Sequence, residues 1–229
     1  TMGNNRDIPE NFKVIKPWGS EYTIYKNSVT TTKLLKLFPN KQTSLHCHPI
    51  KKTGFILLDG EVNVDVGFYD KKILKSISKL MIRPGLFHRT ENKTNKIATI
   101  LEIETPIDID DLVRFKDDYG RKDLPYEGKN NMEKISDDDI VFTTPELNSS
   151  KKYEFLNSII KIQKTNKIES LKNAPKNEIF CILDGGLYAE NDKVVLSPGD
   201  IVKTDTIKKL AEAFNIKNEL SYLSINYEK

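Results

Sequence analysis

Cysteine and histidine are scarce in this chain. Its 229 residues include two cysteines and three histidines, so a framework of several disulfides is excluded. Cys47 and Cys181 lie far apart in separate strand-like runs, and we expect both thiols to be reduced. Reduced thiols are typical of proteins in reducing compartments, so a cytoplasmic location is expected.

Long hydrophobic runs are also absent. No segment of about 18 consecutive apolar residues occurs, so no transmembrane helix is predicted. The first ten residues, TMGNNRDIPE, are polar and predict no signal peptide. Charge of one sign is not in excess either, because 36 Lys and Arg residues stand against 33 Asp and Glu and the basic residues are scattered. The composition therefore gives no indication of binding to nucleic acid or to a membrane.

The three histidines that are present occupy two short segments. His46 and His48 are one residue apart in a strand-like segment, so the alternation of a strand turns both imidazoles to one face. His88 follows a turn at Pro84 and Gly85 and begins another run. Imidazoles are common ligands of divalent metals, and this pattern predicts a metal site made of the three. The alternative is a structural role for each histidine.

The first half of the chain has the pattern of an all-β protein. Strand-like runs are separated by turn residues such as Asp59 and Gly60, and they cover residues 12–25, 31–38, 53–58, 61–66 and 97–105. The run at 53–58, TGFILL, is apolar on both faces, as expected for a strand buried between two layers.

Two carboxylates share one face of the run at 97–105. Glu102 and Glu104 lie two residues apart, so they could line a metal pocket or be solvated at a sheet surface. Ile100 lies on the same face, which favours an inward-facing Glu102. Both residues are candidates for the catalytic base.

The spacing of the histidines resembles the two sequence motifs of the cupin superfamily. The first motif is His-x-His followed by Thr53 and Gly60, and the second is Pro-Gly followed by His88 and Asn92. This resemblance implies a small antiparallel barrel, the double-stranded β-helix or jelly roll, that holds one divalent metal ion. The metal would be Zn, Mn, Ni or Fe.

The second half of the chain repeats the first. CILDGG at 181–186 resembles ILLDGE at 56–61, and this match places Glu178 where Thr53 stands. We therefore predict two tandem cupin barrels, with a metal-binding barrel over 12–104, a connecting helix and loop over 105–130, and a degenerate second barrel over 131–229.

No histidine occurs in the second half. Leu171 and Asn173 fall where His46 and His48 stand, and the remaining histidine would fall near Leu210 or Ala211. Only the first barrel is therefore expected to hold a metal.

Residues 106–128 predict a short helix between the barrels. Asp108 can act as its N-cap, Asp110 lies four residues before Arg114, and Gly120 provides a stop. On this basis the segment would be a charged surface helix.

One branch of the cupins resembles the first half more specifically. KPWG at 16–19, TSLHCH at 43–48 and DDLVRFKDDYGR at 110–121 resemble segments of the barrel domain of type II mannose-6-phosphate isomerases, which also occurs fused to mannose-1-phosphate guanylyltransferase. The resemblance covers about residues 14–128. It implies that the metal contacts sugar oxygens and that arginines hold the phosphate. The substrate contacts that we expect are Arg114, Arg121, Lys51, Lys52 and Thr53, with surface ion pairs as the alternative role of the two arginines.

The leading hypothesis is a metal-dependent isomerase or epimerase of a phosphorylated or nucleotide-linked sugar. A divalent ion on the three histidines would polarise a carbonyl and stabilise the enediolate formed when Glu102 or Glu104 removes a proton. Two alternatives remain open. Three histidines without a carboxylate resemble the iron sites of some cupin dioxygenases, and a barrel could also bind a sugar without turnover. A homodimer through an open sheet edge is compatible with each of them.

Overall fold

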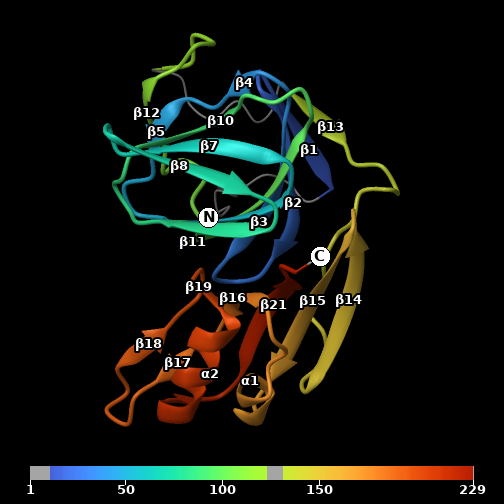
Figure 1. Cartoon of the computed structure of the whole chain (residues 1–229), viewed down its shortest axis with the longest axis vertical. Helices are drawn as coiled ribbons and strands as arrows, with labels where there is room; N and C mark the ends of the chain where they lie inside the picture. The colour runs from blue at the N-terminus through green and yellow to red at the C-terminus, as the bar shows by residue number, and fades with distance from the viewer. Residues whose placement is uncertain (1–10, 123–130, 229) are drawn as a thin grey trace, which may run out of the picture. The chain divides into compact units, whose positions relative to one another are not determined.

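The computed structural model describes residues 11–122 and 131–228, and in these residues the chain is built mainly of antiparallel β-strands (Figure 1). The chain divides into two compact units, Thr1–Val141 and Phe142–Lys229. The prediction of an all-β fold is confirmed.

Two antiparallel sheets form the first unit. One sheet has the order β13 (Met132–Lys134), β1 (Phe12–Lys16), β2 (Gly19–Lys26), β3 (Thr31–Leu37), β11 (Ala98–Thr105), β6 (Lys52–Asp59) and β9 (Ser78–Ile82). The other sheet has the order β12 (Val113–Lys116), β5 (Leu45–Cys47), β10 (His88–Asn92), β7 (Glu61–Val66) and β8 (Asp70–Lys75), and β4 (Lys41–Gln42) pairs with β10.

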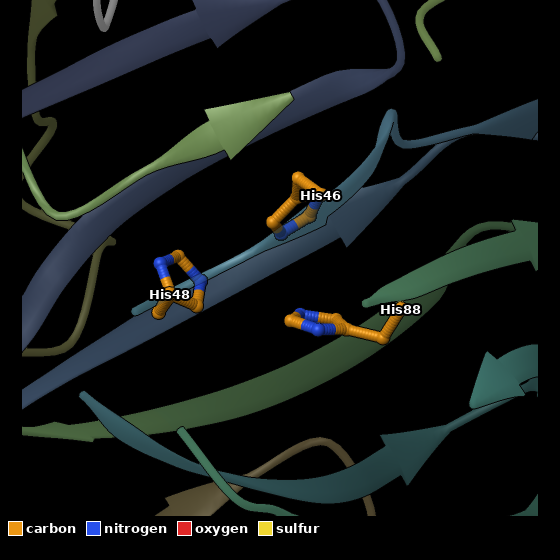
Figure 2. Close-up of side chains that lie close together, drawn as sticks. All are labelled: His46, His48 and His88. Atoms are coloured by element: carbon orange, nitrogen blue, oxygen red, sulfur yellow. The ribbon is translucent and has the colours of Figure 1, made fainter. Parts of the chain in front are cut away.

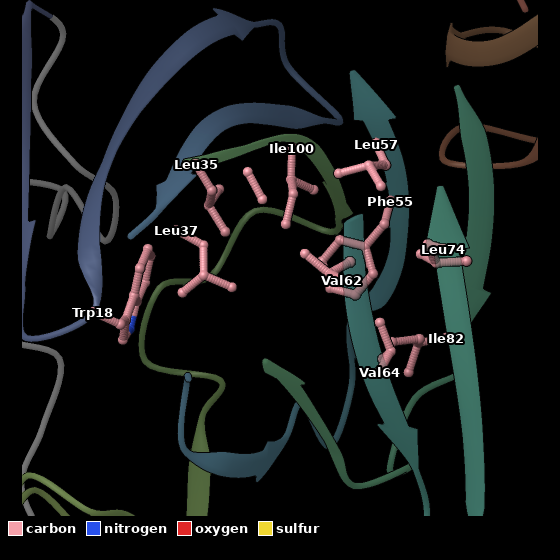
Figure 3. Close-up of a cluster of buried hydrophobic side chains, with 11 residues drawn as sticks. Trp18, Leu35, Leu37, Phe55, Leu57, Val62, Val64, Leu74, Ile82 and Ile100 are labelled. Carbon is pink, nitrogen blue, oxygen red and sulfur yellow. The ribbon is translucent and has the colours of Figure 1, made fainter. Parts of the chain in front are cut away.

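The apolar core of the first unit draws side chains from both sheets (Figure 3). Leu35 and Leu57 come from the first sheet, and Val62 and Val64 come from the second. Each of these strands supplies every second residue to the core, as the alternation of a strand requires. Strand β6 is buried from Thr53 to Leu58, which agrees with its apolar pattern on both faces.

The helix predicted for residues 106–128 is wrong in the part that the structure describes. Residues 106–122 contain turns and strand β12, which runs antiparallel to β5 beside it (Figure 1). Residues 123–128 lie outside the described residues. Val113 and Phe115 favour a strand, and β5 offers an edge to pair with, so the pairing prevails over the local capping signals.

The second unit combines two small sheets with two helices. The five-stranded sheet has the order β14 (Ser149–Phe155), β15 (Ser158–Thr165), β21 (Leu220–Asn226), β16 (Glu178–Asp184) and β19 (Ile201–Lys203). The three-stranded sheet has the order β18 (Val194–Leu196), β17 (Leu187–Tyr188) and β20 (Asn215–Ile216), and the helices are α1 (Glu169–Lys172) and α2 (Thr204–Ala213).

The two helices occupy the segments in which counterparts of the histidines were expected. Leu171 lies on α1 and Asn173 is its C-cap, while Leu210 and Ala211 lie on α2. Leu171 and Ala211 are buried in one apolar cluster of the second unit. Leu171 and Ala211 therefore serve packing, whereas Asn173 is exposed, and these segments form helices rather than strands. Neither helix is long and apolar enough to cross a lipid bilayer.

Candidate metal centre and its cavity

Three imidazoles converge between the strands of the first unit. His46 on β5 and His88 on β10 are direct cross-strand neighbours, and His48 follows at the end of β5. The ring centroids are 4.4 Å apart for His46 and His88, 5.2 Å for His46 and His48, and 5.6 Å for His48 and His88. One ring nitrogen from each histidine lies within 4.8 Å of the others, so the three could hold one metal ion (Figure 2).

The hydrogen bonds of the three rings leave the same nitrogen available in each. Every Nδ1 lies against a backbone carbonyl, which can only accept, so in the neutral ring Nδ1 carries the proton and Nε2 keeps its lone pair. The acceptors are the carbonyl oxygens of Ser44 at 2.8 Å from His46, Asp111 at 2.7 Å from His48 and Leu86 at 3.1 Å from His88. His88 Nε2 is buried without a hydrogen-bond partner. A metal ion would satisfy this atom, so the three residues fit a divalent cation.

Burial keeps the three rings neutral. It lowers the pKa of His46 and His48, and it lowers the pKa of His88 to about 4. The neighbouring imidazoles lower the pKa of His46 and His88 further. Neutral imidazole is the form that binds metals, so the ligands are ready at neutral pH.

Asp111 links the segment after residue 105 to residues 48–51 through hydrogen bonds. Its backbone carbonyl accepts the proton of His48 Nδ1, and its carboxylate accepts the amides of Ile50 at 3.0 Å and Lys51 at 2.8 Å. The carboxylate therefore fixes the turn that follows His48. The sequence contained no indication of this role beyond a cluster of aspartates.

His46 and His48 form part of the wall of a cavity that opens to solvent, and the empty space in it and at its mouth is about 550 Å³. Three lysines, two arginines and three glutamates also line it. Five of these eight groups come from strands β1, β2, β3 and β11 of the first sheet. The cavity therefore carries many charged groups, and the apolar side chains of Trp18, Leu35, Ile109 and Leu112 complete its wall.

Glu102 and Glu104 both line this cavity and are buried. Glu104 Oε2 lies 2.6 Å from Lys51 Nζ and 3.8 Å from Lys33 Nζ. Burial opposes the ionisation of Glu104, but these two lysines hold its pKa well below the usual range. Burial, and then the charge of Glu104, raise the pKa of Glu102 well above the usual range. The two carboxyls thus differ in the ease with which they lose a proton.

Arg114 and Arg121 line the cavity as well. Arg114 Nη1 donates to the carbonyl oxygen of Arg121 at 3.3 Å. Arg121 donates twice to Asp117, from Nη2 at 2.8 Å and from Nε at 3.1 Å. Burial opposes the ionisation of Asp117, but these hydrogen bonds lower its pKa. Asp117 therefore holds Arg121 in place, and Arg121 in turn orients Arg114.

Lys51 lines the cavity, whereas Lys52 and Thr53 are not among the described residues that do so. Thr53 is buried in β6, and its Oγ1 has no hydrogen-bond partner. Strand pairing places Thr53 opposite Glu104. A contact between Thr53 or Lys52 and a substrate remains a prediction.

Sequence reasoning missed three charged residues of the cavity wall. Lys16 Nζ and Glu21 Oε1 form a buried ion pair at 3.5 Å, and Lys33 is the cross-strand neighbour of Glu102. The alternation in TTKLLKLF places Lys33 on the same face as the core residue Leu35. This pattern alone could have predicted an inward-facing Lys33. The pairing of Lys16 with Glu21 depends on the turn between β1 and β2 and had no comparable signal.

The antiparallel sheets and the three converging imidazoles define the first unit as a cupin domain. Residues 4–117 match the family model described as mannose-6-phosphate isomerase C-terminal. The first unit is therefore a cupin domain related to that of mannose-6-phosphate isomerases, as the sequence motifs predicted.

Two relatives of this chain are xanthan biosynthesis proteins named XanB. The xanthan biosynthesis protein XanB of Xanthomonas campestris pv. campestris strain B100 is 29% identical over 112 residues, which cover 48% of this chain and 24% of XanB. XanB of strain ATCC 33913 is 28% identical over 111 residues, which again cover 48% of this chain and 24% of that protein. The chain thus matches about a quarter of the length of these relatives.

Solved structures with a similar domain have low sequence identity to this chain. CapF, a capsular polysaccharide assembling protein of Staphylococcus aureus, aligns with a TM-score of 0.43 and 14% identity over 46% of this chain and 31% of CapF. TT1209 of Thermus thermophilus has a TM-score of 0.38 and 22% identity over 40% of this chain and 88% of TT1209. KdgF of a Halomonas species has a TM-score of 0.38 and 10% identity over 46% of this chain and 93% of KdgF.

Proposed function

We propose that the first unit is a metal-dependent isomerase or epimerase that acts on a phosphorylated or nucleotide-linked sugar. The observation that carries this proposal is one cavity in which imidazoles, a buried carboxyl pair and several cationic side chains meet. Each of these three sets of side chains can contribute to proton transfer at the carbon beside the carbonyl of an anionic sugar.

The three histidines would hold a divalent ion through their Nε2 atoms. Their Nδ1 protons are committed to backbone carbonyls, and this fixes the orientation of each ring. When bound, the ion would polarise a carbonyl oxygen of the substrate as a Lewis acid. The relation to mannose-6-phosphate isomerases supports this assignment.

The carboxyl pair would transfer the proton. Glu102 and Glu104 line the same cavity as His46 and His48, and burial strengthens their electrostatic interactions. A carboxylate in this position can remove a proton from the carbon beside a carbonyl.

The cationic side chains would bind the phosphate. Five lysines and arginines line the cavity against three glutamates, so the wall carries an excess of positive charge even with every carboxyl ionised. Arg114 is oriented by Arg121, and a guanidinium in a fixed orientation suits the oxygens of a phosphate.

The proposal can be tested by hydrogen exchange. The full chain, stripped of metal and then loaded with Zn, Mn, Ni or Fe, is incubated in D2O with hexose and pentose phosphates, and loss of the C2 proton is followed by NMR. We expect exchange with at least one substrate and metal, and none after His88→Ala. A protein that binds one metal per chain and exchanges no substrate would contradict the proposal.

An iron dioxygenase is a second candidate. The cluster that could hold a metal in the described residues consists of three histidines without a carboxylate. An open all-histidine site on Fe(II) can accept oxygen and substrate together. Oxygen consumption that depends on both Fe(II) and an added sugar would favour this function, and sugar binding without any reaction would favour a binding protein.

A further inference from the structure

A second, smaller cavity adjoins the cavity described above, which we call the charged cavity. The empty space in the smaller one and at its mouth is about 310 Å³, and five residues line both cavities, among them His46 and Glu102. His88 lines only the smaller cavity, whereas His48 lines only the charged one. The three imidazoles therefore lie at the junction of the two. We call the smaller cavity the inner pocket, and the residues that line it alone are Leu37, Phe55, His88, Thr90 and Ile100.

The wall of the inner pocket is mainly apolar. Five of its side chains belong to the core cluster of the first unit, and Figure 3 shows them: Trp18, Leu35, Leu37, Phe55 and Ile100. No lysine or arginine is among the described residues that line it, whereas five line the charged cavity. A group bound in the inner pocket is therefore surrounded mostly by hydrocarbon, which favours an apolar group.

The polar atoms of this wall are mostly committed to other partners. Thr43 Oγ1 accepts the amide of Thr90 at 3.0 Å and donates to the carbonyl oxygen of Ser44 at 3.2 Å. His88 Nδ1 donates to a backbone carbonyl, and His88 Nε2 is the atom assigned to the metal. Thr43 and Glu102 line both cavities, so they belong to the boundary. A hydroxyl group deep in the inner pocket would find few partners, and an unsatisfied hydroxyl is costly to bury.

The inner pocket has room for one small group. It admits a sphere of the size of a water molecule, and it offers less such room than the charged cavity. A methyl group is about as large as this sphere. A buried water molecule needs several polar partners, whereas a methyl group needs none, so the pocket suits a methyl group better than water.

We propose that the inner pocket binds the methyl group of a 6-deoxyhexose, while the anionic part of the same substrate lies in the charged cavity. This inference rests on the sugar isomerisation proposed above and names its substrate class. His46 and His88 both line the inner pocket, so a methyl group bound there lies beside the imidazoles. In a 6-deoxyhexose the methyl carbon is attached to C5, and the reacting carbonyl would be the neighbouring C4.

The chemistry of such a sugar also fixes the position of its phosphate. A methyl carbon has no oxygen to phosphorylate, so the phosphate or the nucleotide is attached at C1. In a six-membered sugar ring C1 lies opposite C4, and a phosphate on it would therefore point away from the imidazoles. Arg114 and Arg121 line the charged cavity but not the inner pocket, so they would receive this group.

The test compares sugars that differ in one hydroxyl group. Full-length protein loaded with Zn²⁺ is titrated with the 6-deoxy forms of glucose, galactose and mannose 1-phosphate, and each is compared with its parent sugar phosphate. Ring and phosphate are the same within a pair, so the ratio of the two affinities isolates the effect of C6. Trp18 lines both cavities and is the single tryptophan of the chain, so its fluorescence reports binding without turnover.

We expect the 6-deoxy sugar of at least one pair to bind at least about tenfold more tightly than its parent. The reason is that an apolar pocket discriminates against an added hydroxyl by up to about a hundredfold. A smaller preference in every pair, tighter binding of the parent sugars, or no binding by any of the sugars would overturn the proposal.

Two valine variants on β11 test whether the inner pocket causes the preference. Ile100→Val removes a methyl group from the pocket wall and leaves space for a hydroxyl, so the affinity ratio should fall by about threefold or more. Ile103→Val is the same change at a buried residue on the opposite face of the strand, and it should keep the wild-type ratio. Zn²⁺ affinity should be unchanged in both. Equal ratios in the two variants would overturn the assignment of the pocket.

The outcomes distinguish this inference from the proposed function. A protein that exchanges sugar protons but shows no preference for 6-deoxy sugars overturns the methyl site and leaves the isomerase proposal standing. A protein that prefers 6-deoxy sugars but exchanges no substrate overturns the isomerase proposal, while the methyl site itself is supported.

Discussion

His46 and His88 lie opposite each other on β5 and β10, and their ring centroids are 4.4 Å apart (Figure 2). Forty-two positions of sequence separate them, and pairing of the two strands brings them together. Because strand register fixes this contact, the sheet itself holds two of the three candidate ligands, and His48 follows directly after β5.

Removal of His88 should abolish tight metal binding. Loss of an outer hydrogen-bond partner of a ligand typically weakens binding by about 10-fold to about 100-fold, so loss of a ligand should exceed about 100-fold. Titration of the metal-free His88→Ala protein with Zn²⁺ by calorimetry measures the change, and Glu154→Gln serves as the control. Affinity within a few-fold of wild type would show that the three histidines do not form the site.

The metal-free protein should lose stability as the pH falls from about 6.5 to about 4. The folded-state pKa of His88 is about 4, below the ordinary value of 6.5, so the unfolded chain binds more protons in this window. At higher pH both states are neutral at this residue and the full stability remains. The loss from His88 alone is on the order of 3 kcal/mol. Urea unfolding across the window measures it, and the slope with pH should be smaller in His88→Ala.

Asp111→Ala should weaken metal binding without removing a ligand. The carboxylate of Asp111 accepts the amides of Ile50 and Lys51 and so fixes the turn after His48. We expect metal affinity to fall by about tenfold, as for other residues that orient a ligand. Calorimetric titration compares this variant with Asp110→Asn, whose residue is exposed. Equal affinities in the two variants would show that the turn does not depend on the carboxylate.

Leu171→Ala should destabilise the second unit and spare metal binding. Leu171 is fully buried in the apolar cluster that also holds Ala211, so the cavity left by the substitution should cost about 3 kcal/mol. Denaturant unfolding measures the loss, and Leu147→Ala, at a partly exposed leucine, is the control. Zn²⁺ affinity should match that of wild type, and a large change in it would contradict separate roles for the two units.

The fold of the first unit could be predicted to a large extent. Turns at Gly60 and Gly85 and the alternation at 61–66 are local features, and the strands they predict are present. The helix prediction for residues 106–128 is wrong over 106–122, because its caps are local helix signals, whereas the open edge of β5 is provided by distant residues. The sequence predicted that Glu102 and Glu104 share a face, but not that Lys33 lies beside them. The register of β3 against β11 places Lys33 opposite Glu102.

The sequence by itself determined that three imidazoles occupy two strand segments of one half of the chain, since their identity and the two-residue period of a strand are local properties. The tertiary structure decided which nitrogens face inward, which carboxyl lies against the lysines, and that Leu171 and Ala211 lie on helices. Those outcomes depend on hydrogen bonds, burial and strand pairing between distant residues, which no local pattern encodes.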